Sequence, residues 1–131
     1  TEGLVGSEMC IRDRVRDKIK VYANGWYSGE RSPENFAKKA KFLSIKGYQA
    51  LKFDPFGSEH LRLNKESENF IKKIIRSVRD SVGPDVELMI EGHKRFNVFE
   101  AIKIAKWLDE FDVTWFEDPS LVLLKIASDP V

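Results

Sequence analysis

Two short apolar runs in the second half of the chain end in carboxylates, and an imidazole follows the first of them. The run VELMI ends at Glu91, with His93 two residues later, and the run VTWF ends at Glu117. An amphipathic segment joins the two runs, as in a strand–helix–strand unit. Because successive parallel strands end at the same edge of a sheet, we expect the three side chains to meet there. Such a group suits a hard divalent cation with an acid or base beside it.

The composition is that of an ordinary globular protein. The chain has 131 residues, 42% of them hydrophobic, and 22 Lys and Arg against 21 Asp and Glu leave a net charge of +1. This balance gives no reason to expect binding to nucleic acid or to an anionic membrane. Cys10 is a single cysteine, so an intramolecular disulfide is excluded and a cytoplasmic location fits. The apolar run at 121–127 is too short to cross a bilayer.

The sequence divides into three parts. Residues 1–14 have no clear period, and MCIRDR at Met9–Arg14 resembles the translation of a transposon end used to prepare sequencing libraries. We interpret this part as a non-native leader or sequencing scar, with a disordered leader as the alternative. Residues 15–119 form the predicted domain, and residues 120–131 are interpreted as an aberrant C-terminal tail.

Strand and helix patterns alternate through the domain. Strands are predicted from alternating or continuous apolar residues at Lys18–Ala23, Tyr48–Phe53, Val86–Ile90 and Val113–Phe116. Helices are predicted from apolar spacing and capping residues between Ser32 and Gly47, over Lys65–Val82, and from Asn97 to about Leu108.

The third helix has the most detailed prediction. Asn97 is expected to cap it, with Glu100 as the reciprocal partner in a capping box. Its inward face is predicted from helical spacing to carry four apolar residues, Ala101, Ile102, Ala105 and Leu108.

The order β-α-β-α-β-α-β, with helices long enough to be crossovers, predicts parallel strands. A doubly wound sheet and half of an eight-stranded barrel both fit this order. Asn24–Tyr27 after the first strand is not a glycine-rich phosphate loop. Polar residues follow all four strands, and α/β barrels build active sites at that rim. The predicted fold class is therefore α/β, a partial (β/α)8 TIM-type barrel of about the first four βα units.

From Val15 to about Pro119 the chain resembles the barrel domain of the enolase superfamily. Within the mandelate racemase and muconate-lactonizing branch it looks most like the acid-sugar dehydratases of the galactonate dehydratase type. The matching segments are VRDKIKVYANGW, ALKFDPFG, LMIEGHKRF and WFEDP, in the order of the family. The resemblance covers only part of a family member.

The resemblance implies a magnesium site. Glu91 stands where the first metal-binding carboxylate of the family sits, usually an Asp, and Glu117 stands where the second sits. Removing a proton next to a carboxylate creates an enediolate, and enolase-type sites stabilise it with one or two Mg²⁺ ions. The implied cofactor is Mg²⁺, and a third carboxylate would follow a later strand.

The resemblance also implies roles for five other residues. Lys52 matches the first lysine of a KxK motif and would stabilise the substrate carboxylate. His93 matches the histidine that protonates the departing hydroxyl in sugar-acid dehydratases. Asn24, Asp54 and Arg95 would line the substrate region. Asp54 stands where KxK members have their second lysine, which serves as the base, so the base would come from later strands.

The implied function is that of a fragment of a Mg²⁺-dependent sugar-acid dehydratase, a carbon–oxygen lyase. The parent would abstract an α-proton and expel water from an aldonate-like acid to give a 2-keto-3-deoxy acid, and it would be a homo-oligomer. This chain by itself is predicted to be inactive. Two alternatives stay open: a non-catalytic truncated half-barrel that associates through open sheet edges, and a racemase or epimerase of the same branch, against which Asp54 weighs.

Overall fold

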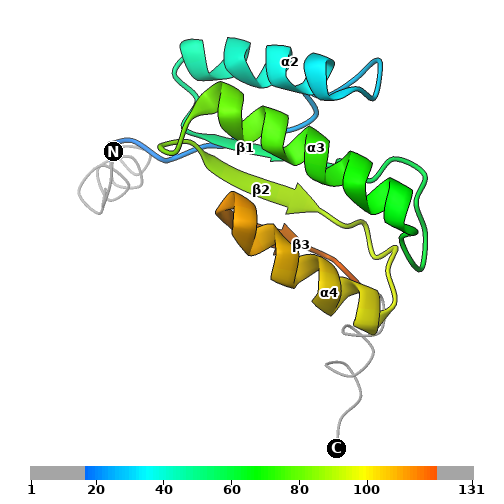
Figure 1. Ribbon diagram of the computed structural model, residues 1–131. Coiled ribbons are helices and arrows are strands. Elements are labelled where there is room, and N and C mark those ends of the chain that lie inside the picture. The colour runs from blue at the N-terminus through cyan, green and yellow to red at the C-terminus, as the bar shows by residue number, and fades with distance from the viewer. Residues whose placement is uncertain (1–16, 121–131) are drawn as a thin grey trace, which may run out of the picture.

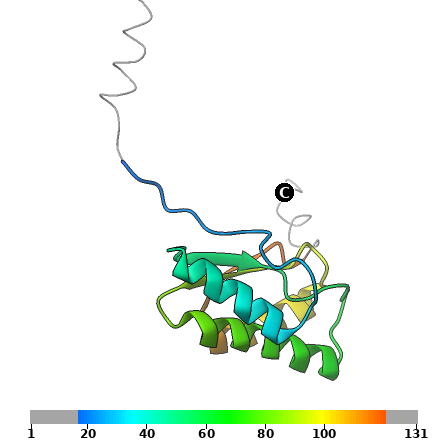
Figure 2. The ribbon, with the colours of Figure 1, turned by 90° about the horizontal axis from the view of Figure 1, so that it is seen from above.

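The computed structural model describes residues 17–120, which form a parallel sheet with helices on one of its faces (Figures 1 and 2). The elements in chain order are α2 (Pro33–Ile45), β1 (Ala50–Phe53), α3 (Lys65–Val82), β2 (Glu87–Glu91), α4 (Val98–Leu108), the 3₁₀ helix η1 (Asp109–Phe111) and β3 (Val113–Glu117). The interpretation of residues 1–14 lies outside the described residues, and so does that of residues 120–131 apart from Ser120, which is buried.

The three strands lie in the order β1-β2-β3, and both pairings are parallel. This arrangement confirms the α/β class and the parallel strands. Leu51 pairs with Leu88 in the register, and Glu91 pairs with Glu117. All three carboxyl ends therefore lie at one edge of the sheet.

The strand predicted at Lys18–Ala23 is wrong for the described residues. Only an isolated parallel bridge between Ala23 and Leu51 forms there, with hydrogen bonds to the carbonyl of Ala50 and from the amide of Lys52. Ile19 and Val21 are 80% and 66% exposed. Alternating apolar residues favour a strand only where one face is buried, and residues 18–22 are exposed on both faces in the described structure.

The helices begin where their capping residues predict. The side chains of Ser32, Asn64 and Asn97 each accept a hydrogen bond from the amide three residues later. The predicted capping box is only half formed, because the Glu100 carboxylate contacts Lys103 at 3.3 Å. The amide of Asn97 instead donates to the carbonyl of Leu61 at 3.2 Å.

The core lies between the sheet and the helices. Leu51, Phe53, Leu88 and Ile90 project from β1 and β2 and are fully buried. They pack with the buried apolar stripe of α3, formed by Ile71, Ile74, Ile75 and Val78. Burying this apolar surface, at roughly 25 cal/mol per Å², is the main stabilising contribution to the fold.

The inward face predicted for α4 is partly wrong. Ala101 and Leu108 are buried as expected, but Ile102 is 49% exposed and Ala105 is exposed. Ile104 takes the central place in the core. Apolar residues flank both sides of the stripe, so the sequence period alone does not set the rotation of this helix.

No helix of the described residues lies on the other face of the sheet (Figure 2). Met89 of β2 is half-buried there, and its register neighbour Trp115 is 50% exposed. Near the amino ends of β1 and β2, residues 18–22 help to frame a cavity of about 500 Å³, away from the predicted site residues. Among residues 17–120, no helix is long and apolar enough to span a membrane.

Candidate active site

Three charged side chains from three strands meet at the carboxyl edge of the sheet. Glu91 and Glu117 are register partners at the ends of β2 and β3. The ammonium group of Lys52, from β1, lies 2.7 Å from Glu91 Oε2 and 2.6 Å from Glu117 Oε2. Lys52 and Glu91 are buried, at 6% and 8% exposure. The expectation that the two carboxylates meet is confirmed, and Lys52, which was expected near the ion, contacts both of them.

The contacts within this triad shift the pKa values of Lys52 and Glu91. Burial lowers the pKa of Lys52, but the hydrogen bonds to Glu117 and Glu91 outweigh it, so the pKa is raised overall. Burial raises the pKa of Glu91, whereas the hydrogen bonds from Lys52 and from the amide of His93 lower it, and the lowering prevails. Lys52 and Glu91 therefore keep their charges at neutral pH.

His93 lies beside the triad, but for a different reason than the sequence suggested. Strand β2 ends at Glu91, so strand pleating does not set the direction of His93. His93 instead adopts a left-handed backbone conformation with φ of 50°, and its amide donates to Glu91 Oε1 at 2.9 Å. The turn after β2, and not the alternation of side chains along the strand, therefore sets the direction of His93.

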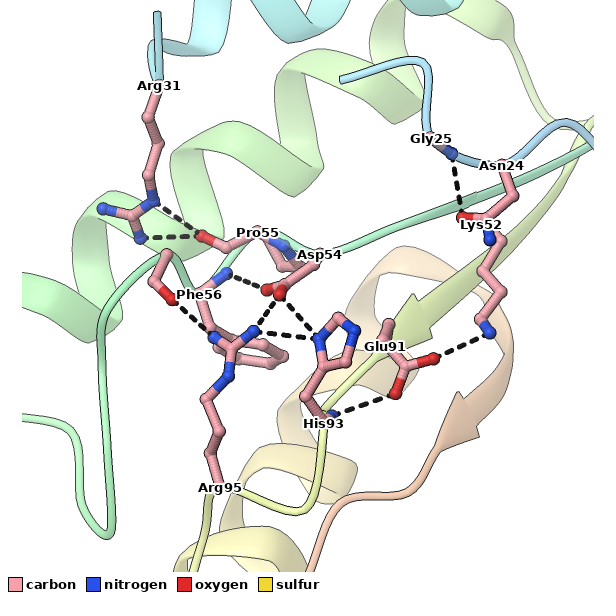
Figure 3. Close-up of polar contacts among 11 residues, drawn as sticks. Asn24, Gly25, Arg31, Lys52, Asp54, Pro55, Phe56, Glu91, His93 and Arg95 are labelled. Carbon is pink, nitrogen blue, oxygen red and sulfur yellow. Dashed lines mark hydrogen bonds and ion pairs between the residues drawn. The ribbon is translucent and has the colours of Figure 1, made fainter. Parts of the chain in front are cut away.

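Asp54 links the loop after β1 to the loop after β2 (Figure 3). Its Oδ1 accepts from the amide of Phe56 at 2.9 Å, and its Oδ2 lies 2.9 Å from His93 Nδ1. The same Oδ2 pairs with the guanidinium of Arg95. Arg95 also donates to the carbonyl of Gly57 at 2.7 Å. Asp54, His93 and Arg95 thus form one polar cluster.

Asn24 has a different environment from the other predicted site residues. Its Oδ1 accepts from the amide of Gly25 at 2.9 Å, a contact within its own turn (Figure 3). The side chain is exposed and makes no described contact with Lys52 or with the Asp54 cluster. Its predicted substrate contact stays a prediction.

The sequence reasoning did not single out Gly92 or Tyr27. A Cβ atom on Gly92 would lie 2.8 Å from Pro119 Cα and 3.0 Å from the carbonyl oxygen of Asp118. The loops after β2 and β3 therefore approach closely only because residue 92 lacks a side chain. The position of Gly92 between the predicted site residues Glu91 and His93 was the one feature of the sequence that could have indicated its role.

Tyr27 lies near the charged groups, on the loop before α2. Burial raises the pKa of its hydroxyl, and the charges of Asp54 and Glu91 raise it further. The ring stacks on Phe36 with centroids 6.0 Å apart. An aromatic residue in a loop has no sequence pattern that distinguishes this position from ordinary packing.

The carboxylates fit a magnesium ion as part of its ligand set. Mg²⁺ is commonly held by one or two carboxylates, with waters and substrate oxygens completing the octahedron. Glu91 and Glu117 supply hard oxygen ligands that already converge on one cation, the Lys52 ammonium. Residues 17–120 hold no group of three or more His, Cys, Asp or Glu side chains arranged to bind a metal.

Residues 35–125 match the enolase C-terminal domain-like family. The match spans more than half of the chain, so the chain belongs to this family. A crystal structure of an enolase superfamily member from Salmonella Typhimurium superposes with a TM-score of 0.75 at 25% identity, covering 85% of this chain and 33% of that one. The fold is therefore part of a TIM-type barrel of the enolase superfamily.

Two curated relatives are dehydratases. The chain is 45% identical over 106 residues to the D-gluconate dehydratase of Thermoproteus tenax, and 38% identical over 102 residues to the D-gluconate/D-galactonate dehydratase of Picrophilus torridus. These alignments cover 81% and 78% of this chain. They span only 21% and 26% of the relatives' lengths.

Proposed function

We propose that the chain is part of a sugar-acid dehydratase that uses Mg²⁺. The observation that carries the proposal is the convergence of Glu91 and Glu117 on one cation, with His93 bonded to Glu91 through its amide. The similarity to gluconate and galactonate dehydratases supports an aldonate-like acid as the substrate. A cytoplasmic location and a homo-oligomeric parent belong to the same proposal.

In this proposal Glu91 and Glu117 would hold the magnesium ion, and the ion would supply positive charge to stabilise the substrate carboxylate as the enediolate forms. Lys52 adds a second positive charge and orients that carboxylate. These roles are compatible with the geometry, because the Lys52 ammonium group contacts both carboxylates and lies near the end of β1. Asn24 is proposed to contact a substrate hydroxyl.

His93 is proposed to act as the general acid. A base from beyond the described residues removes the α-proton, and the electron pair left on the α-carbon forms the enediolate. The pair then forms the Cα–Cβ double bond as the C–O bond to the 3-hydroxyl breaks. His93 gives its proton to the departing oxygen, which leaves as water. The enol product takes up a proton to become the 2-keto-3-deoxy acid.

A substitution in a complete dehydratase that contains this segment tests the role of His93. His93→Asn should lower dehydration by on the order of 10²- to 10⁴-fold, because the leaving hydroxyl loses its proton donor. Exchange of the α-proton with solvent deuterium should continue. His60→Asn is the matched control, since His60 is exposed in a loop. Loss of both reactions in His93→Asn would contradict the assignment.

A magnesium titration of the 131-residue chain tests the metal site separately. We expect weak binding, on the order of millimolar, because this chain contributes two carboxylates. Glu91→Gln and Glu117→Gln should each abolish it. Glu87→Gln, an exposed carboxylate at the other end of β2, is the control. Unchanged binding in both site variants would place the ion elsewhere.

A further inference from the structure

The turn that carries His93 does not hold the imidazole in place by itself. His93 and Lys94 both have left-handed backbone conformations, with φ of 50° and 58°. The His93 side chain is 53% exposed, so packing constrains the ring weakly. A proton donor must keep one orientation toward the substrate. The direction of the ring therefore depends on its polar contacts.

Asp54 is itself a fixed acceptor. Its side chain is 9% exposed, and Oδ1 is held by the amide of Phe56 at 2.9 Å. This leaves Oδ2 to face His93 Nδ1, also at 2.9 Å. A lysine at position 54, as in KxK members, could not accept a hydrogen bond from an imidazole N–H.

Arg95 holds the other side of Asp54. Its guanidinium pairs with Oδ2 and donates to the carbonyl of Gly57 at 2.7 Å, so it joins the two loops. One of its terminal nitrogens, Nη2, also lies 2.9 Å from His93 Nδ1. Because Nδ1 is engaged in this cluster, Nε2 is the ring nitrogen left for the substrate, and it points away from Asp54 (Figure 3).

We propose that Asp54 is a positioning residue for His93, which it holds through Nδ1 so that Nε2 faces the substrate, and that Arg95 fixes Asp54 in turn. This inference rests on the proposed function only in naming His93 as the acid. When Nε2–H has given its proton to the leaving hydroxyl, the neutral ring stays in the Nδ1–H form, which donates to Asp54. Asp54 thus serves the acid instead of contacting the sugar acid.

The two contacts of Nδ1 predict opposite tautomers, which makes the inference testable by NMR. A ring that donates to Asp54 carries its proton on Nδ1, whereas a ring that accepts from Arg95 carries it on Nε2. Nitrogen-15 shifts of the imidazoles in the 131-residue chain, at alkaline pH where the rings are neutral, distinguish them. We expect Nδ1–H for His93, and the opposite form would overturn the inference.

Variants at position 54 complete this measurement. Asp54→Ala should move His93 to the Nε2–H form, because the acceptor is gone. Asp54→Asn keeps an oxygen acceptor and should give an intermediate result. Asp118→Asn is the matched control, because Asp118 lies at the same rim and faces Lys94 at 3.7 Å. An identical His93 spectrum in wild type and Asp54→Ala would also overturn the inference.

A kinetic measurement in a complete dehydratase that contains the segment distinguishes positioning from substrate binding. Asp54→Asn should lower kcat for dehydration by on the order of 10²-fold, with KM and α-proton exchange retained. A raised KM with unchanged kcat would show that Asp54 binds substrate, and would overturn the inference. If His93→Asn spares dehydration, the assignment of His93 as the general acid fails, but the tautomer result is unaffected.

Discussion

The two ends of the sheet each contain a cation that joins several elements, but the two cations have different partners. At the carboxyl end, Lys52 contacts two carboxylate side chains. At the amino end, Arg79 of α3 donates to four backbone carbonyls, those of Gly83, Val86, Phe111 and Asp112, at 2.6 to 3.0 Å. Arg79 thereby ties the end of α3 to the starts of β2 and β3.

The pKa shifts of the two cations follow from their partners. Burial lowers the pKa of Arg79, and the charge of Asp112 offsets this only in part. Burial also acts on Lys52, but its two carboxylates reverse the direction. Neutral carbonyls accept the hydrogen bonds of the Arg79 guanidinium without adding charge, which suits a residue that holds elements together. At the carboxyl end, two carboxylates face one ammonium group, an arrangement that suits the proposed metal site.

The largest effect should come from breaking the contacts of Arg79. Arg79→Met should lower the free energy of unfolding by about 3 kcal/mol, because charged hydrogen bonds are lost and carbonyls are left without partners. Urea denaturation of the 131-residue chain measures this. Arg76→Met, three residues earlier on α3 and placed over the Phe111 ring, should cost far less. Equal losses would show that Arg79 has no special structural role.

Removing the Lys52 ammonium group should destabilise the chain in a way that magnesium can restore. Lys52→Met leaves two carboxylates facing each other and should cost about 2 kcal/mol, less than for a fully buried pair because the Glu117 side chain is 32% exposed. Magnesium should restore the lost stability, since the ion replaces the ammonium, but should not rescue Arg79→Met. Thermal melts with and without Mg²⁺ measure both. If magnesium does not restore the stability of Lys52→Met, the carboxyl end of the sheet would not differ from the amino end in its ability to bind a cation.

Gly92→Ala should test how much the close approach of the loops after β2 and β3 contributes to the site, because this substitution changes no charge. The added Cβ would meet the backbone of Pro119 and Asp118, so the loops must move apart, at a cost of about 1.5 kcal/mol. The free energy of unfolding and the Mg²⁺ affinity should both fall. Lys94→Ala, in the same turn, is the control and should change stability little. A neutral Gly92→Ala would show that the two loops can adjust without loss.

The smallest effect should be a change in acid sensitivity. The pKa of Glu91 is lowered in the folded chain, so its contribution to stability is present above the ordinary carboxyl pKa of about 4.3. It is lost as the pH falls through the lowered value. Glu91→Gln should therefore flatten the loss of stability below about pH 4 in acid titrations followed by circular dichroism. Glu87→Gln should keep the wild-type curve.

Local patterns predicted most of the secondary structure. The predicted caps at Ser32 and Asn97 act within a few residues, so their effect is visible in the sequence. Helices α2 and α3 accordingly begin where expected. The segment at Lys18–Ala23 and the rotation of α4 depend on what lies beside them, so the strand prediction was wrong and the predicted face of α4 was partly wrong. Local propensity is a weak guide where tertiary contacts decide.

The sequence alone determined that Glu91 and Glu117 would meet, because parallel strands joined by crossover helices end at one edge. Only the tertiary structure decided that Lys52 lies between them and that Asp54, across a loop, contacts His93. The direction of a side chain beyond the last strand residue follows from turns and distant partners. No period or spacing along the chain records those contacts, since they form only when separate loops pack together.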